Sequence, residues 1–175
     1  QQGGINLKHR PVVVGFGPAG IFAALSLARC GFKPIVIERG EDVDKRSLSV
    51  DKFWEENILN TESNVSFGEG GAGTFSDGKL NTMVKDKSGR NNEVLKTLVE
   101  FNAPKDILTD PKPHIGTDLL KGIIKNIREE IIRLGGEVRF STKLEDINYK
   151  DKHLQSIKLS NGMILDCETL VLAIG

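Results

Sequence analysis

The apolar positions near the start of the chain follow a strand, turn, helix and strand in sequence. Residues 12–14 are three consecutive valines, a β-branched run typical of a strand buried on both faces of a parallel sheet. From Pro18, apolar residues recur at the three- and four-residue spacing of a helix, and Gly31 is placed to end it. The apolar residues 34–37 predict the next strand. This pattern predicts a complete βαβ unit.

Helical spacing recurs in three later stretches. Residues 41–59 predict one helix or two short ones, with Trp54 in the core, and residues 92–101 predict a short helix. The clearest helix covers 117–134, where Thr117 is the expected N-cap and an apolar stripe follows one side. Lys121, Lys125, Arg128 and Glu129 lie on the other side of that helix.

The second half of the chain is rich in short strand patterns. Residues 137–140 follow the long helix and predict a third parallel strand, reached by a second crossover. Three alternating runs then predict an antiparallel meander over 144–149, 154–159 and 163–167, with a hairpin turn at Asn161-Gly162. The continuous apolar run 169–174 predicts a fourth, buried strand of the main sheet. The fold class is therefore α/β.

The first turn carries the chemistry of a dinucleotide site. Gly15, Gly17 and Gly20 match G-x-G-x-x-G, which allows a tight turn, close approach of a pyrophosphate and close helix packing. Glu38 ends the second strand, where an acid is expected to bind an adenosine ribose and to disfavour NADP, although Arg39 beside it weakens the second point. The alternative is that the glycines serve packing alone.

Other polar positions leave two interpretations open. Residues 64–80 contain five glycines and few apolar side chains, so they form either a flexible linker or a backbone wall against a ligand, and are not expected in the core. Arg46 either reaches a phosphate or lies solvated on a helix face. His114 lies in a proline-rich loop, where a histidine more often caps a turn than takes part in chemistry.

Composition narrows the class of protein. The 175 residues contain 24 basic residues (Lys and Arg together) and 24 acidic residues (Asp and Glu together), which gives a formal net charge of zero. This balance, without a basic patch, argues against a nucleic-acid partner. The sequence contains neither a run of 18 apolar residues nor a signal peptide, so we expect a cytoplasmic protein without a membrane partner. Cys30 and Cys167 form neither a redox pair nor a metal set, which favours structural packing. No metal site is predicted.

Length and termini suggest part of a longer chain. Residues 1–175 are enough for one domain and too few for two ordinary ones. No initiator Met is present, and the sequence stops directly after a strand-like run. We expect an excised or truncated part of a larger protein, with the remaining C-terminal part of the same chain as its partner.

The order of elements resembles the FAD-binding domain of the glutathione-reductase-like flavoproteins. Within that group, the stretches GFGPAGIFAAL, PIVIERG, ESNVSFGEGGAGTFSDGKL and KPHIGTD resemble the FAD-dependent, NAD-utilising dehydrogenase family. The resemblance implies a three-layer FAD/NAD(P)-binding Rossmann-like fold. Its usual A-T-G motif corresponds to Ala173-Ile174-Gly175 here, where the middle residue differs.

The resemblance also implies roles for individual residues. Gly15, Gly17, Pro18, Ala19 and Gly20 would cradle the FAD pyrophosphate. Glu38 and Arg39 would hold the adenosine, and Val138 would lie beside the adenine. The other implied cofactor contacts are Gly70, Gly71, Ala72, Gly73 and Thr74 near the flavin, and Ala173 and Gly175 at the end of the last strand. To these we add Arg46 as a candidate phosphate contact, from its position in the sequence.

The predicted function is the FAD-binding portion of a flavoprotein oxidoreductase, a dehydrogenase that transfers hydride through FAD, with NAD(P)H as a candidate co-substrate. In the resembling flavoproteins a later Gly-Asp segment completes the flavin site, so the 175 residues alone are expected to be inactive. Two alternatives remain: an NAD-binding Rossmann dehydrogenase domain, and a non-catalytic nucleotide-binding module of an RNA-modifying or regulatory protein. The sequence names no substrate, electron donor, electron acceptor or catalytic acid or base.

Overall fold

The computed structural model describes residues 7–80 and 86–175. The elements are β1 (Val12–Val14), α1 (Pro18–Arg29), β2 (Ile35–Ile37), α2 (Val43–Glu56), the 3-10 helix η1 (Ala72–Phe75), α3 (Arg90–Glu100), the 3-10 helix η2 (Lys105–Leu108), α4 (Thr117–Arg133), β3 (Glu137–Arg139), β4 (Leu144–Lys150), β5 (His153–Leu159), β6 (Ile164–Asp166) and β7 (Leu170–Leu172).

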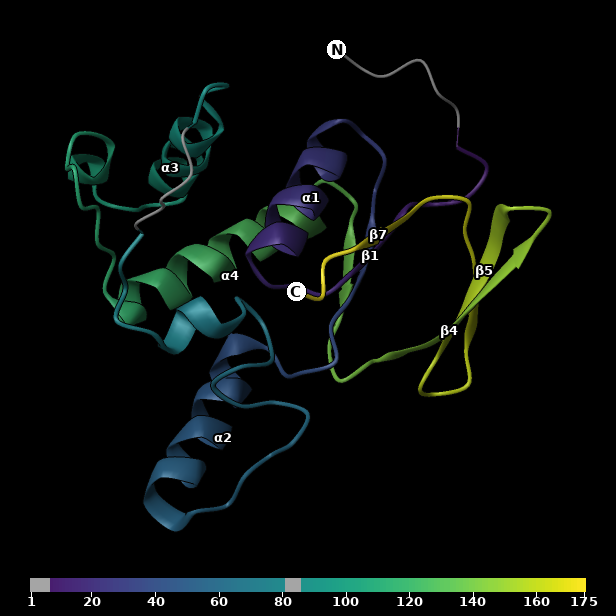
Figure 1. Ribbon diagram of the computed structural model, residues 1–175, viewed down its shortest axis with the longest axis horizontal. Helices are drawn as coiled ribbons and strands as arrows, with labels where there is room; N and C mark the ends of the chain where they lie inside the picture. The colour runs from purple at the N-terminus through teal and green to yellow at the C-terminus, as the bar shows by residue number, and fades with distance from the viewer. Residues whose placement is uncertain (1–6, 81–85) are drawn as a thin grey trace.

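Two sheets and a layer of helices form the three layers of the fold (Figure 1). The parallel sheet has the strand order β3-β2-β1-β7, and β4, β5 and β6 form a separate antiparallel sheet. Helices α1 and α4 cover one face of the parallel sheet, and the antiparallel sheet packs on the other. The α/β class and the antiparallel crossover meander predicted from the sequence are confirmed.

The pleat of the central strands explains why the sheet is covered on both faces. Val13 and Val36 point into the core beneath α1 and α4. Their neighbours Val12 and Ile35 point the other way, against the antiparallel sheet. Successive side chains of a strand alternate between faces, so a strand that is apolar at every position requires a layer on each side.

Helix α4 makes the second crossover and lies beside α1. Ile123, Ile127 and Ile131 are its fully buried residues at four-residue spacing, and burial of such a side chain is worth about 1.5–3 kcal/mol. The predicted N-cap was wrong by one position, because Gly116 is the N-cap and Thr117 is the first helical residue. None of the helices in the described ranges is long and apolar enough to cross a membrane.

Helix α2 projects from the layered part of the molecule, which overturns one core prediction. Trp54 is 60% exposed, and its ring lies edge-on to Phe75 at 6.5 Å between centroids. The buried residues of α2 are Val43, Arg46 and Val50, all in its first two turns, and the later turns project away from the layers (Figure 1). The aromatic side chain was therefore misassigned to the core.

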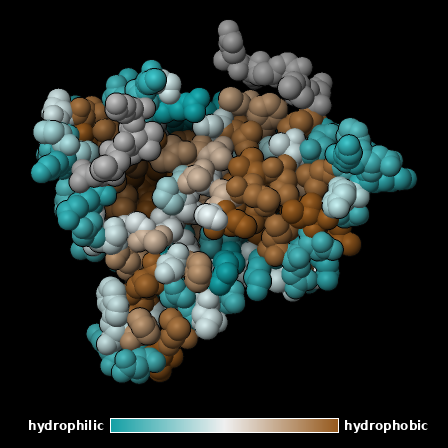
Figure 2. Space-filling view, in the orientation of Figure 1, coloured by the Kyte–Doolittle hydropathy of each residue, from teal (hydrophilic) through white to brown (hydrophobic). Residues whose placement is uncertain are grey.

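Strand β7 pairs with β1 as predicted, but it is the edge of the sheet among the described strands. Leu172 is consequently 53% exposed and Ile174 70% exposed, so the prediction of a fully buried strand was wrong. Figure 2 shows apolar residues gathered over this part of the surface, with a smaller group on α2. Cys167 is buried in the core beneath the antiparallel sheet, and Cys30 is exposed.

Candidate functional site

The three glycines of the β1–α1 turn are present for different reasons. Gly15 has φ of +96°, and a Cβ there would lie 2.4 Å from the Ala173 carbonyl oxygen. A Cβ on Gly20 would lie 1.8 Å from the Gly15 carbonyl oxygen. At Gly17 the nearest atom to a Cβ would be the Gly71 Cα at 3.6 Å, which is ordinary van der Waals contact. The fold requires glycine at the first and third positions but not at Gly17.

The turn presents backbone donors that can bind an anion. In the part of the chain that the structure describes, the N–H groups of Gly17, Ala19 and Gly20 have no acceptor, and α1 has no side-chain cap. Pro18 and Ala19 are exposed. Free N–H groups and the positive end of a twelve-residue helix attract phosphate. The turn is therefore an open, electropositive backbone site.

Glu38 is bound to the same turn. Its carboxylate is buried, with Oε2 accepting from the Phe16 N–H at 2.7 Å and Oε1 accepting from the Gly40 N–H at 2.8 Å. A carboxylate has about four acceptor positions, so two remain for hydroxyl donors such as those of a ribose. Glu38 thus fixes the turn, a contact that nothing in the sequence spacing signals, and its contact with a ribose stays a prediction.

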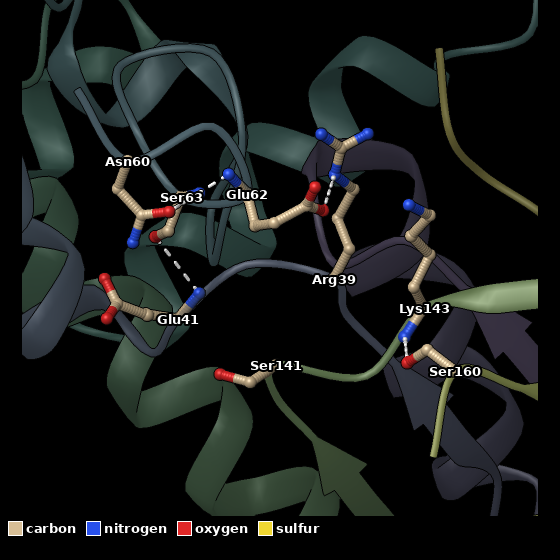
Figure 3. A pocket seen from close by; sticks show the side chains of 8 residues that line it. All are labelled: Arg39, Glu41, Asn60, Glu62, Ser63, Ser141, Lys143 and Ser160. Atoms are coloured by element: carbon tan, nitrogen blue, oxygen red, sulfur yellow. Dashed lines mark hydrogen bonds and ion pairs between the residues drawn. The ribbon is translucent and has the colours of Figure 1, made fainter. Parts of the chain in front are cut away.

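A polar pocket of about 270 Å³ opens at Arg39, the residue that follows Glu38 in the chain (Figure 3). Its lining comes from the end of β2, the 60–63 loop, the segment after β3 and the β5–β6 hairpin: Arg39, Glu41, Asn60, Glu62, Ser63, Ser141, Lys143 and Ser160. Arg39 pairs with Glu62 at 3.3 Å and lies 4.2 Å from the centre of the Phe67 ring. Val138 does not line this pocket, since it packs against the core beneath α1 and α4.

Residues 68–74, called the glycine loop below, lie against the turn. The Gly70 N–H donates to the Phe16 carbonyl oxygen at 2.9 Å, and a Cβ on Gly71 would lie 3.2 Å from the Gly17 Cα. Gly73 is exposed, and no atom lies within 4 Å of where its Cβ would be. The loop is packed rather than a free linker, and Gly73 is its one glycine that the contacts within the described residues do not explain.

Arg46 binds backbone carbonyl groups of the glycine loop and of the segment before it. Its side chain is fully buried, so the solvated alternative was wrong. The guanidinium donates to four backbone carbonyl oxygens, those of Asn64 at 2.8 Å, Val65 at 3.1 Å, Glu69 at 2.6 Å and Gly71 at 2.9 Å. Burial lowers the pKa of Arg46 to about 10, which leaves it charged at neutral pH. Contact of Arg46 with a phosphate stays a prediction.

Glu69 is a buried carboxylate that sequence reasoning missed. Oε2 accepts from the Val43 N–H at 2.7 Å and from Arg128 Nη1 at 2.8 Å, and the Arg128 side chain is only 15% exposed. Burial raises the pKa of Glu69 to about 7, against the opposing effects of the Val43 N–H and Arg128. Its stretch was not expected in the core, yet Glu69 and Thr74 are fully buried.

The segments SDGKL and KPHIG, which carried the family resemblance, pair with one another. Lys79 and His114 form an isolated antiparallel bridge, and the Leu80 N–H donates to the Pro113 carbonyl oxygen at 2.9 Å. His114 Nε2 lies 2.8 Å from the Asp77 carbonyl oxygen, a contact that supports the turn-capping interpretation. Among the described residues, no three His, Cys, Asp or Glu side chains are arranged to hold a metal ion.

The end of β7 completes the turn. The Ala173 N–H donates to the Val14 carbonyl oxygen at 2.8 Å, and the Ala173 carbonyl lies against Gly15. Gly175 is exposed with φ of +85°. Of the predicted cofactor residues, those of the turn, the glycine loop and the β7 end therefore lie together, and Arg39 lines the adjoining pocket.

No protein-family model matches the chain. An uncharacterized protein of Clostridium beijerinckii is 65% identical over 169 residues, covering 97% of this chain and 31% of that protein. The chain thus spans about a third of the length of that relative.

Solved structures show the fold. OTEMO in complex with FAD and NADP matches with a TM-score of 0.58 and 18% identity over 98% of this chain and 26% of that chain. HlmI matches with a TM-score of 0.51 and 15% identity over 95% of this chain and 35% of that chain. The chain has a FAD/NAD(P)-binding Rossmann-like fold.

Proposed function

We propose that this chain is the FAD-binding portion of a flavin-dependent oxidoreductase. The observation that carries the proposal is Gly17, a glycine that the fold itself does not require, at a turn with free N–H groups and a neighbouring carboxylate. A ligand pyrophosphate that comes close to the backbone explains this combination. The fold shared with OTEMO, whose solved complex contains FAD and NADP, is consistent with it.

The residues fit FAD as a set. The pyrophosphate would take the N–H groups of Gly17, Ala19 and Gly20, and the two unused acceptor positions on Glu38 would take the ribose hydroxyls. The pocket lined by Arg39 and Ser141 offers polar partners to the adenine. The exposed, glycine-lined side of the loop at Gly73 leaves room for the remainder of the cofactor.

The protein and the cofactor divide the chemistry between them. Bound FAD supplies the hydride exchange. The residues of this chain bind the dinucleotide, orient it and shield it on the side of the glycine loop. NAD(P)H is the electron donor we propose, in keeping with the resemblance to the FAD-dependent, NAD-utilising dehydrogenases.

Calorimetric titration of the full-length protein with FAD, NAD and ADP tests the proposal. We expect FAD to bind more tightly than NAD. ADP should also bind measurably, because it contains the adenosine and the two phosphates that this turn would hold. Binding of NAD in preference to FAD would instead favour an NAD-dependent dehydrogenase. Absence of binding by all three nucleotides would contradict the proposal.

A further inference from the structure

The buried pair of Glu69 and Arg128 links three elements to the dinucleotide turn. Glu69 lies in the glycine loop, Arg128 lies on α4, and the Val43 N–H that donates to the same carboxylate begins α2. The next residue, Gly70, donates its N–H to the Phe16 carbonyl oxygen of the turn. A change in the position of the Glu69 carboxylate can therefore shift Gly70, and through its hydrogen bond the backbone of the turn.

The position of the loop over the turn depends on these contacts. Gly71 lies directly on Gly17 and Pro18, since a Cβ on Gly71 would be 3.2 Å from the Gly17 Cα and 3.0 Å from Pro18 Cδ. Arg46 donates to the carbonyl oxygens of Glu69 and Gly71. Among the described residues, the ion pair with Arg128 is the polar contact that joins the glycine loop to α4.

A purely stabilising role explains the pair poorly. Removing two charges from water costs several kcal/mol, and a buried ion pair often stabilises a fold no better than apolar residues of similar size. Glu69 Oε1 is also buried without a hydrogen-bond partner among the described residues, which adds to the cost. Such a pair is better suited to fixing one geometry than to adding stability.

We propose that Glu69, held by Arg128, is a positioning residue that sets the glycine loop against the β1–α1 turn and thereby sets the affinity for the dinucleotide. The inference rests on the proposed function. Glu69 is fully buried, so it acts through the backbone of Gly70 and Gly71 and does not touch the ligand.

The charge of Glu69 gives this role a pH dependence. Arg128 on α4 attracts the carboxylate, Asp42 and Asp44 at the start of α2 repel it, and Arg46 is a further positive charge that interacts with it. Burial raises the pKa of Glu69 to about 7, so the carboxylate gains a proton as the pH falls through neutrality and loses its ionic attraction to Arg128. Dinucleotide affinity should then weaken from pH 8 to pH 6.

Calorimetric titration of the full-length protein with FAD at pH 6, 7 and 8 tests the inference. Glu69→Gln keeps an acceptor for the Val43 N–H but cannot ionise. Glu130→Gln is the matched control, because it breaks the Glu130–Arg133 pair at the surface of α4, the helix that carries Arg128. We expect the affinity of the unaltered protein and of Glu130→Gln to fall about tenfold toward pH 6, and Glu69→Gln to bind about tenfold more weakly at pH 8 with no pH dependence.

Each outcome decides a separate point. A flat pH profile of the unaltered protein contradicts the pH dependence without any variant. Equal affinity at pH 8 of the unaltered protein and of the folded fraction of Glu69→Gln overturns the positioning role itself, and titration of that fraction keeps a folding defect from obscuring the result. Absence of FAD binding by the unaltered protein at every pH would refute the proposed function, and this inference with it.

Discussion

The three glycines of the β1–α1 turn differ in whether the fold itself requires them. Gly15 and Gly20 occupy positions where a Cβ would overlap carbonyl oxygens, and Gly17 does not. The sequence motif treats the three alike. The distinction matters for mutagenesis, because only the middle position can be changed without first disturbing the fold.

Gly17→Ala should weaken FAD binding while leaving the fold nearly intact. Its methyl group meets the Gly71 backbone at ordinary van der Waals distances, Cα at 3.6 Å and N at 4.0 Å, so we expect the free energy of unfolding to change by less than about 1 kcal/mol. The methyl group would occupy the space that the pyrophosphate needs, and we expect at least a tenfold loss of affinity, or about 1.4 kcal/mol. Urea unfolding and calorimetry measure the two quantities.

Gly122→Ala is the matched control for that experiment. Gly122 lies within α4 with no atom near the place of a Cβ, so alanine should stabilise the helix by about 0.5–1 kcal/mol and leave FAD affinity unchanged. Undiminished FAD affinity in Gly17→Ala would show that its glycine does not mark a ligand site.

Glu38→Ala should weaken both the fold and FAD binding. The substitution leaves the buried N–H groups of Phe16 and Gly40 without an acceptor, at a cost of about 1–3 kcal/mol in unfolding free energy. Loss of a charged acceptor for the ribose should cost a further 1.5–3 kcal/mol, roughly, in FAD binding. The folded fraction is titrated with FAD, and normal affinity in that fraction would remove Glu38 from the ligand site.

Among the elements, the pairing of the 77–80 and 113–115 segments depends on Gly78. Its φ is +77°, and a Cβ there would lie 2.2 Å from the Ile115 carbonyl oxygen. Gly89 has a similar φ of +73° but no atom within 4 Å, so Gly89→Ala measures the backbone strain alone, about 1–2 kcal/mol. Gly78→Ala should lower the free energy of unfolding by more than this in urea titration. Equal losses would mean that the close contact has no energetic effect.

The buried Glu69 should make stability depend on pH. The folded state raises the pKa of this carboxyl from 4.5 to about 7, so the folded protein binds the proton more tightly than the unfolded chain. The free energy of unfolding should therefore fall as pH rises from 4.5 to 7, by roughly 3 kcal/mol for this group, and stay level above pH 7. Urea unfolding of the unaltered protein and Glu69→Gln isolates the effect, and parallel pH profiles would contradict it.

The elements themselves were readable from the sequence, because their apolar periods are local. The three valines of β1, the stripe of α4 and the Asn161-Gly162 turn all lie where the pattern placed them. Contacts between distant segments were not readable. Arg128 lies 59 residues from Glu69 and appears on a polar helix face, and no local pattern reports that the two are buried together.

For the whole molecule, the βαβ unit with its glycine turn was predictable because β1, α1 and β2 follow one another directly, whereas the three-layer arrangement was implied by the family resemblance. The roles of Arg46 and Glu69 in holding the glycine loop arise only when α2, α4 and that loop meet. The edge position of β7 likewise depends on the strand order of the sheet, which the apolar run 169–174 does not report.

The absorbance spectrum of the full-length protein tests the account most directly. We expect the visible bands of oxidised flavin in the purified protein or after incubation with FAD and gel filtration, and FAD as the compound released on denaturation. The Gly17→Ala protein should retain less flavin in the same procedure. A full-length protein that stays colourless after incubation with FAD would contradict the central claim that this turn binds the cofactor.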